Sequence, residues 1–88
     1  MGVKVHPRVM QRHPELSEAD VLSAWANAHW YATRYTGDKD AEIAIGADAN
    51  GRLLEMVAAE DDEGNLVVFH ANTPPTKKFM QELGLLGR

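Results

Sequence analysis

Residues 66–84, LVVFHANTPPTKKFMQELG, form the stretch of sequence that decides the fold. Leu66 to Ala71 is an apolar, β-branched run that predicts a strand, and it carries one histidine, His70. Pro74 and Pro75 then interrupt the chain, because proline lacks the N–H that a continuing strand would use. The stretch therefore predicts a strand, a break and a new element.

The new element is predicted to be a short helix. Phe79, Met80 and Leu83 make an apolar stripe at helical spacing. Lys77 and Lys78 stand in the first turn, where cations oppose the helix dipole. These two lysines have two interpretations, as ligands of an anion or as part of a solvated helix face.

His70, at the end of the strand and near this helix start, also has two interpretations. An imidazole there suits a general base or a phosphate contact, because histidine titrates near neutral pH. A half-buried histidine with one hydrogen bond is the alternative. Strand alternation predicts that His70 shares a face with Leu66 and Val68, and that Phe69 points the other way.

The chain before this stretch reads as more of the same sheet. Glu42–Ala47 and Arg52–Ala59 are β-type segments, joined to each other and to Leu66–Ala71 by short turns rich in Asp, Asn and Gly. Connections this short predict an antiparallel meander. Trp30–Thr36 is either a further strand or an extended segment that folds over one edge.

The N-terminal third is predicted to be mainly helical. Val3–Val5 suits a short strand, and Pro7 opens a compact helix that ends at Pro14. Ser17, with Asp20 three residues later, predicts a capped helix over residues 18–28. The expected order is β-α-α-β-β-β-α, a single α+β domain over residues 1–88 with helices packed on one face of an antiparallel sheet.

Composition limits the class of protein. The 88 residues are 44% apolar and 25% charged, which is the globular range for one small domain. Without cysteine there is neither a disulfide nor a thiolate metal site, and no signal peptide or membrane span is evident, so a cytoplasmic protein is expected. His6 and His13 lack the spacing of a metal pair, so we expect no metal and no cofactor.

The charge is unevenly distributed although the formal net charge is −4. Residues 1–14 hold three cations and two histidines without an acid, residues 73–81 hold two lysines without an acid, and residues 60–63 are all acidic. Arg8 and Arg12, four apart, would share a helix face that clamps a phosphate or an acidic peptide, or forms a solvated edge. Arg34 and Arg52 come from different β segments and could converge across the sheet.

The aromatic side chains Trp25, Trp30, Tyr31 and Tyr35 lie within eleven residues. They suit core packing in a small domain, and base stacking by an RNA-binding protein is the alternative.

Three segments together resemble one protein family. Residues 6–27, HPRVMQRHPELSEADVLSAWAN, resemble the opening of BrnT-like toxins of the RelE/ParE toxin superfamily, where a His/Arg-bearing helix precedes an x-S-x-x-D-V helix start. Residues 43–58, IAIGADANGRLLEMVA, are similar to that family's central hairpin, and residues 67–84 to its closing strand and helix. The resemblance covers nearly the whole chain and implies a small RelE-like fold.

The resemblance also implies a function. It implies the toxin of a type II toxin–antitoxin system, a ribonuclease that cleaves mRNA, often at the ribosome, and is silenced by a cognate antitoxin. The chemistry would need no metal, because RNA is cut by its own 2′-hydroxyl once protein groups move the protons and steady the phosphate. On this hypothesis His70 is the acid or base and Arg34 and Arg52 stabilise phosphate charge. The flanking phosphates would be held by Arg12, Lys77 and Lys78.

Two rival hypotheses are not enzymatic. The acidic balance, and Asn72 where BrnT-like members usually have arginine, favour an interaction module that keeps the toxin-like fold and binds a protein partner. A small-ligand or regulatory domain that pairs through an exposed strand edge is the other hypothesis. The sequence also leaves a homodimer possible.

Overall fold

The computed structural model describes residues 2–35 and 40–85, which fold into a sheet of five strands with three helices. In chain order the elements are β1 (Val3–Val5), α1 (Pro7–Arg12), α2 (Glu18–Ala26), β2 (Trp30–Arg34), β3 (Ala41–Ala47), β4 (Leu53–Glu60), β5 (Leu66–Asn72) and α3 (Lys77–Glu82). The α+β class predicted from the sequence is confirmed. No helix within the described residues is long and apolar enough to cross a membrane.

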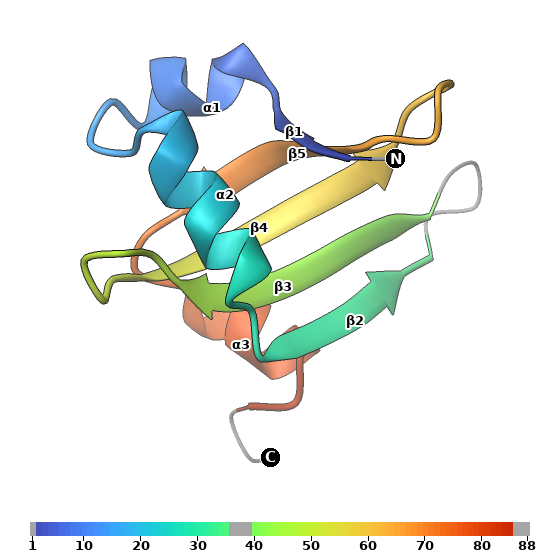
Figure 1. Cartoon of the computed structure of the whole chain (residues 1–88). Coiled ribbons are helices and arrows are strands. Elements are labelled where there is room, and N and C mark those ends of the chain that lie inside the picture. Colours follow the sequence, from blue (N-terminus) through green and yellow to red (C-terminus); the bar gives the residue numbers. More distant parts are fainter. Residues whose placement is uncertain (1, 36–39, 86–88) are drawn as a thin grey trace.

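The sheet is mixed, with strand order β1-β5-β4-β3-β2 (Figure 1). The meander β3 to β5 is antiparallel, as its short turns predicted, and β2 adds to it antiparallel to β3. The prediction of an entirely antiparallel sheet is wrong for β1, which lies parallel to β5. Between β1 and the meander the chain passes through two helices, and a connection of that length lets a strand enter in the parallel direction.

Trp30–Thr36 had two interpretations from the sequence, a strand or an extended segment over one edge, and the structure shows a strand there, β2. β2 pairs with β3 from Trp30 opposite Ile45 to Arg34 opposite Ala41. The order is therefore β-α-α-β-β-β-β-α, with one strand more than predicted. Thr36, at the end of the predicted segment, lies outside the described residues.

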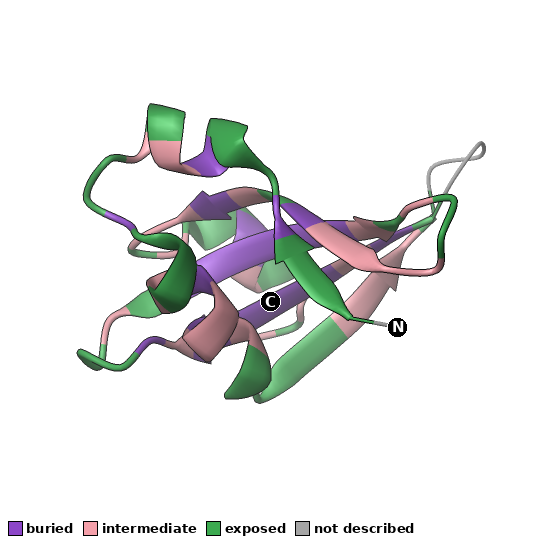
Figure 2. Ribbon diagram, turned by 45° about the horizontal axis from the view of Figure 1, so that its top comes forward, coloured by how far each residue is buried: buried purple, intermediate pink, exposed green. Residues whose placement is uncertain are grey.

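The helices cover both faces of the sheet, so the prediction that they share one face is wrong. Helices α1 and α2 lie on one face and α3 on the opposite face (Figure 1). The cause is the composition of the central strands. In β3 and β4 successive residues are buried, whichever face they point to (Figure 2), and a sheet that is apolar on both sides must be covered on both sides.

Two cores result. The first lies beneath α1 and α2, and its buried members are Val5, Val9, Leu16, Val21, Ala24, Ala44, Leu54, Met56, Ala58, Val68 and Ala71. The second lies beneath α3, and its buried members are Ala41, Ile43, Ile45, Val57 and Phe79. Met80 and Leu83 pack against this second core, which confirms the apolar stripe predicted for the last helix.

Local signals fix where the helices begin. The side chain of Ser17 accepts a hydrogen bond from the N–H of Asp20, and the Asp20 carboxylate accepts one from the N–H of Ser17, which confirms the capping box. The Nδ1 atom of His6 accepts from the N–H of Arg8 and so caps α1. Helix α2 can lie close to β3 because Gly46 has no side chain there.

A β-bulge in β5 changes which way the end of that strand faces. Ala58 pairs with Val68 and Val57 with His70, so Phe69 has no partner on β4. Val68 and Ala71 both belong to the first core, although they are three residues apart. The predicted alternation, with His70 on the face of Val68, is therefore wrong. The extra residue turns His70 to the face that carries α3.

Candidate active site

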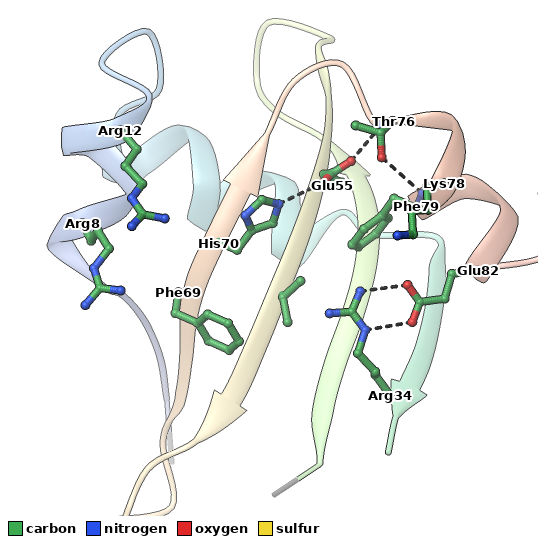
Figure 3. A pocket seen from close by; sticks show the side chains of 11 residues that line it. Arg8, Arg12, Arg34, Glu55, Phe69, His70, Thr76, Lys78, Phe79 and Glu82 are labelled. Carbon is green, nitrogen blue, oxygen red and sulfur yellow. Dashed lines mark hydrogen bonds and ion pairs between the residues drawn. The ribbon is translucent and has the colours of Figure 1, made fainter. Parts of the chain in front are cut away.

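A groove of about 550 Å³ opens on the α3 face of the sheet (Figure 3). We call it the basic groove. Residues of α1, β2, β4, β5 and α3, with the residue that caps α3, line it. They are Arg8, Arg12, Arg34, Glu55, Val57, Phe69, His70, Thr76, Lys78, Phe79 and Glu82. Five of these side chains were candidates from the sequence, and the fold brings those five together.

The arginines of α1 reach this groove because β1 is short. β1 pairs with β5 only over Leu66–Val68, so it leaves the rest of that edge of β5 open. The N–H of His6 donates to the carbonyl of Val68 at 2.9 Å, which starts α1 beside the open part. Arg8 and Arg12 then project along one side of the groove (Figure 3).

Both arginines are exposed and have no ion-pair partner among the described residues. The predicted sharing of one helix face by Arg8 and Arg12 is confirmed, since both line the same groove. Two guanidinium groups one helical turn apart, with no acid to neutralise them, favour a ligand that carries negative charge.

His70 and Glu55 form a hydrogen-bonded pair at the centre of the groove. The Nε2 atom of His70 lies 2.8 Å from Oε2 of Glu55. Glu55 is almost fully buried, at 5% exposure, whereas 40% of the His70 side chain is exposed. The second carboxylate oxygen of Glu55 accepts from the N–H of Thr76 at 2.7 Å, so both of its oxygens are occupied.

The pair defines what His70 can do. A carboxylate only accepts hydrogen bonds, so an ionised Glu55 accepts one from the N–H at Nε2, and Nδ1 of the neutral ring is left as an acceptor. Figure 3 shows the second ring nitrogen on the side of the ring away from Glu55, toward α1. His70 therefore presents a basic nitrogen to the groove with its tautomer fixed by a buried acid, as in catalytic His–carboxylate pairs.

Arg34 lies at the β2 end of the groove and is held by Glu82. Its Nε and one terminal nitrogen each donate to the carboxylate at 2.8 Å, and its guanidinium lies 6.0 Å from the centre of the Phe79 ring. The hydrogen bonds from Arg34 lower the pKa of Glu82, outweighing the opposite effect of burial. The structure thus brings Arg34 into the groove with His70, as an ion pair rather than as a free cation.

The two lysines of α3 differ in position. Lys78 lines the groove and Lys77 does not, although both are exposed. Phe69, 45% exposed, provides an apolar part of the groove wall beside His70. His70 shares this face with Phe69 because of the β-bulge, since regular alternation would have put the two side chains on opposite faces.

Arg52 does not line the groove. Its Nε donates to Asp48 at 2.8 Å, one terminal nitrogen donates to Asp20 at 3.1 Å, and the other to the carbonyl of Glu15 at 3.2 Å. Burial acts to raise the pKa of Asp48, but hydrogen bonds from Arg52 and from the backbone of Asn50 outweigh it and lower that pKa. The structure thus gives Arg52 the role of tying the β3–β4 turn to α2, away from His70.

Sequence reasoning missed Glu55, Phe69 and Glu82. Glu55 had a usable signal, because it is the one acid inside the apolar run LLEMVAA and a strand buried on both faces has no solvated position for it. Strand alternation placed Phe69 on the face opposite Val68, but the bulge that brings His70 to that same face leaves no trace in the hydrophobic pattern.

The aromatic cluster predicted from the sequence lies outside the basic groove. Trp25 packs against the first core and its ring meets that of Tyr31 edge to face, with centroids 6.2 Å apart. Trp30, Tyr31 and Tyr35 are exposed, so the expectation of core packing is met by Trp25 alone.

Trp25 and Tyr31 instead line a second groove, of about 790 Å³, which we call the acidic groove. Its charged lining residues are all acids: Asp40, Glu42, Glu60, Asp61 and Asp62. The charge asymmetry of the sequence therefore becomes two separate surfaces of opposite sign.

His6 and His13 have local partners, since His6 caps α1 and Nδ1 of His13 lies 3.4 Å from Glu15. Within residues 2–35 and 40–85, no group of three or more His, Asp or Glu side chains is arranged to hold a metal ion. Comparison of the chain with protein-family models, with curated proteins and with solved structures finds no match.

Proposed function

We propose that this chain is the toxin of a type II toxin–antitoxin system, a ribonuclease that cleaves mRNA in the basic groove and is silenced by a cognate antitoxin. One observation carries the proposal. The His70–Glu55 pair, which suits a general base, opens into a groove edged by Arg8, Arg12 and Lys78, three cations without an ion-pair partner among the described residues. A base beside unpaired cations is what cleavage of a phosphodiester needs.

The proposed reaction uses the RNA's own 2′-hydroxyl as the nucleophile. Nδ1 of His70 takes the proton of that hydroxyl while its oxygen forms a bond to the adjacent phosphorus. The bond from phosphorus to the 5′ oxygen breaks, and this oxygen takes a proton from the Lys78 ammonium or from a water molecule. The products are a 2′,3′-cyclic phosphate and a 5′-hydroxyl end, and no oxidant, reductant or metal is consumed.

The cations act on the charge that develops at phosphorus. Arg8 and Arg12, on the α1 side of His70, and Lys78, on the α3 side, flank the position where a phosphate would lie (Figure 3). Guanidinium groups bind phosphate oxygens with two parallel hydrogen bonds, which fixes the phosphate as well as stabilising it. Phe69 offers a ring on which a neighbouring base can stack.

The function is tested by expressing the chain alone in a bacterial host. Growth arrest with loss of mRNA is expected, and the His70→Ala variant should relieve it. His29→Ala is the matched control, because His29 is exposed and lies outside the groove. Undiminished toxicity of a folded His70→Ala variant would contradict the role of His70.

A second test uses the purified protein and a short single-stranded RNA. The fragments should carry 2′,3′-cyclic phosphates and 5′-hydroxyls, and a substrate with a 2′-deoxy position at the cleaved bond should stay intact. Cleavage of that deoxy substrate would rule out the 2′-hydroxyl mechanism.

The interaction module is the second candidate function, and Asn72 favours it. The side-chain amide of Asn72 donates to the carbonyl of Pro74 at 3.3 Å, so a residue at the end of β5 serves the turn instead of supplying a cation. On this candidate the basic groove binds an acidic segment of a protein partner. Normal growth and intact mRNA in cells that express the folded native chain would favour it over the ribonuclease.

A further inference from the structure

The two edges of the sheet differ in how well they are protected. Edge strand β1 has three residues, carries Lys4, and gives way to α1 at its end. Edge strand β2 has five residues, WYATR, with neither proline nor charge before Arg34 and with no bulge in its pairing to β3. Regular edges without a bulge, a proline or a central charge are the ones that proteins normally blunt, because their free N–H and C=O groups pair with another strand.

The side chains of β2 add an apolar surface to this edge. Trp30 is 41% and Tyr31 56% exposed, and they point to opposite faces of the sheet because they are neighbours on a strand. Aromatic residues are enriched in the buried centres of protein interfaces. A second strand beside this edge would bury part of both rings at once.

The sequence of β2 matches itself in the antiparallel direction. About a twofold axis at Ala32, Tyr31 meets Thr33 of a second copy, Trp30 meets Arg34 of the second copy, and the small Ala32 meets itself at the axis. The partners on each face are an aromatic ring with a guanidinium and an aromatic ring with a β-branched residue, both favourable cross-strand pairs. No like charges meet in this register.

We infer that β2 is the interface of a homodimer, in which two copies pair antiparallel through Trp30–Arg34 and join their sheets into one. The inference stands apart from the proposed ribonuclease function, because it rests on the strand edge alone. It has a consequence for the basic groove, since Arg34 lines that groove. Trp30 of each copy comes to lie against Arg34 of the other and becomes part of the groove's end.

The twofold axis runs perpendicular to the joined sheet, so the α3 faces of both copies lie on the same side. The two basic grooves therefore face the same way, with the paired strands between them.

The first test measures oligomeric state by sedimentation equilibrium over a wide range of protein concentration. The native chain should be a dimer, and Trp30→Lys should weaken the dimer at least about tenfold, because a cation would face Arg34 of the second copy. Leu53→Lys is the matched control, since Leu53 is similarly exposed at 44% but lies on an inner strand. A native chain that is monomeric throughout, or equal weakening by both variants, would overturn the inference.

The second test fixes the register and does not depend on how well Trp30→Lys folds. The chain has no cysteine, so Ala32→Cys introduces a single thiol at the proposed axis. Facing residues of antiparallel strands have Cα atoms about 4.5–5.5 Å apart, within the range of a disulfide. Mild oxidation should convert this variant to a covalent dimer much faster than Leu53→Cys. Equal rates for the two variants would exclude self-pairing at Ala32. This is also the result expected if β2 pairs with a different protein.

Discussion

At the scale of single residues, Glu55 links the proposed chemistry to the fold. One of its oxygens holds the ring of His70 and the other accepts from the N–H of Thr76, the residue that caps α3. A nearly buried carboxylate is costly unless its oxygens are bonded, and here both are. The position of α3 and the tautomer of His70 therefore depend on one side chain.

Replacement of Glu55 by Gln separates these two roles. The amide oxygen can still accept from Thr76, but the amide nitrogen is a donor, so Nε2 of His70 must become an acceptor and Nδ1 loses its basic lone pair. We expect RNA cleavage to slow by roughly 10²–10⁴-fold, the usual contribution of a positioned general acid or base. Single-turnover cleavage assays measure this. Glu63→Gln is the control, as an exposed acid.

A Glu55→Gln variant that is folded, as judged by circular dichroism, and cleaves RNA at the native rate would show that the pair does not set the reactivity of His70. Glu55→Ala loses both hydrogen bonds and should also lower the free energy of unfolding by about 1–3 kcal/mol.

Arg52 tests the difference between a structural cation and a catalytic one. It bonds Asp48, whose side chain is buried and whose pKa is lowered in the folded protein. A group with a lowered pKa stabilises the fold above its unfolded pKa, about 3.9 for Asp, and this contribution disappears as the pH falls through the folded value. Arg52→Ala should therefore lower the free energy of unfolding by about 1–3 kcal/mol at neutral pH.

Urea denaturation of the native chain and of Arg52→Ala, at neutral pH and below about pH 3, measures this difference, which should shrink in acid. RNA cleavage per folded molecule should stay unchanged, because Arg52 lies outside the basic groove. A folded Arg52→Ala variant without cleavage would instead support the catalytic role predicted from the sequence.

At the scale of elements, α3 sorts its two adjacent lysines into different environments. Lys78 lines the basic groove, whereas Lys77 lies outside it. Each phosphate contact to single-stranded nucleic acid contributes about 0.7 to the slope of log K against log salt. Lys78→Ala should reduce that slope by about 0.7, and Lys77→Ala, the matched control, should leave it unchanged. Fluorescence anisotropy with labelled RNA measures both, in a His70→Ala background that prevents cleavage.

A native slope for Lys78→Ala would mean that the face of α3 toward the groove does not contact RNA. The phosphate contacts would then have to lie elsewhere.

Helix α2 rests on β3 at Gly46, and this contact explains why a glycine stands inside a buried strand. A Cβ at Gly46 would collide with the backbone carbonyl of Ala24 and the backbone of Ala28. Backbone atoms cannot turn away as a side chain does, so Gly46→Ala should lower the free energy of unfolding by at least about 1–3 kcal/mol, the usual cost of overpacking. Gly2→Ala is the control, since its Cβ would meet only Asn65, at an ordinary 3.6 Å. Urea midpoints of the two variants decide the prediction, and equal midpoints contradict it.

The elements also show which structural features a local sequence pattern predicts. The strands of the meander, the capping box at Ser17 and the apolar stripe of α3 follow from periods and caps that are local properties of the chain. The side of the sheet that α3 covers is not local. An apolar stripe such as Phe79 and Met80 predicts that one side of a helix is buried, but not against which face of the sheet. Both faces of the central strands are apolar, so either could have packed against α3.

The site was predictable in its members more than in its assembly. His70, Arg34, Arg12 and Lys78 were recognisable as chemistry-bearing side chains, and Arg8 as the companion of Arg12. Their meeting depends on one bulged residue in β5, which no period records, and on the shortness of β1. Arg52 is likewise a cation on a β segment, but in the fold it forms ion pairs with Asp48 and Asp20 and lies outside the groove.

At the scale of the whole molecule, an acidic protein is proposed to bind a polyanion. The formal net charge is −4, but the acidic groove holds five acids and the basic groove holds four fixed cations against two acids. The molecule extends 38 Å along its longest axis, whereas charges in water are screened within about 8 Å at physiological ionic strength. The local sign of a surface then matters more than the total.

Neutralising acids outside the basic groove tests this reasoning. Asp62→Asn with Glu63→Gln removes two negative charges from the β4–β5 turn and changes the formal net charge from −4 to −2. At physiological salt the affinity for RNA should stay within about twofold of native, because screening separates the turn from the basic groove. At low salt, where the screening length reaches about 30 Å, association should become faster than native. Stopped-flow binding at both salt concentrations measures the association and dissociation rates, and their ratio gives the affinity. A large gain in affinity at physiological salt would show that RNA binding depends on the total charge rather than on the groove.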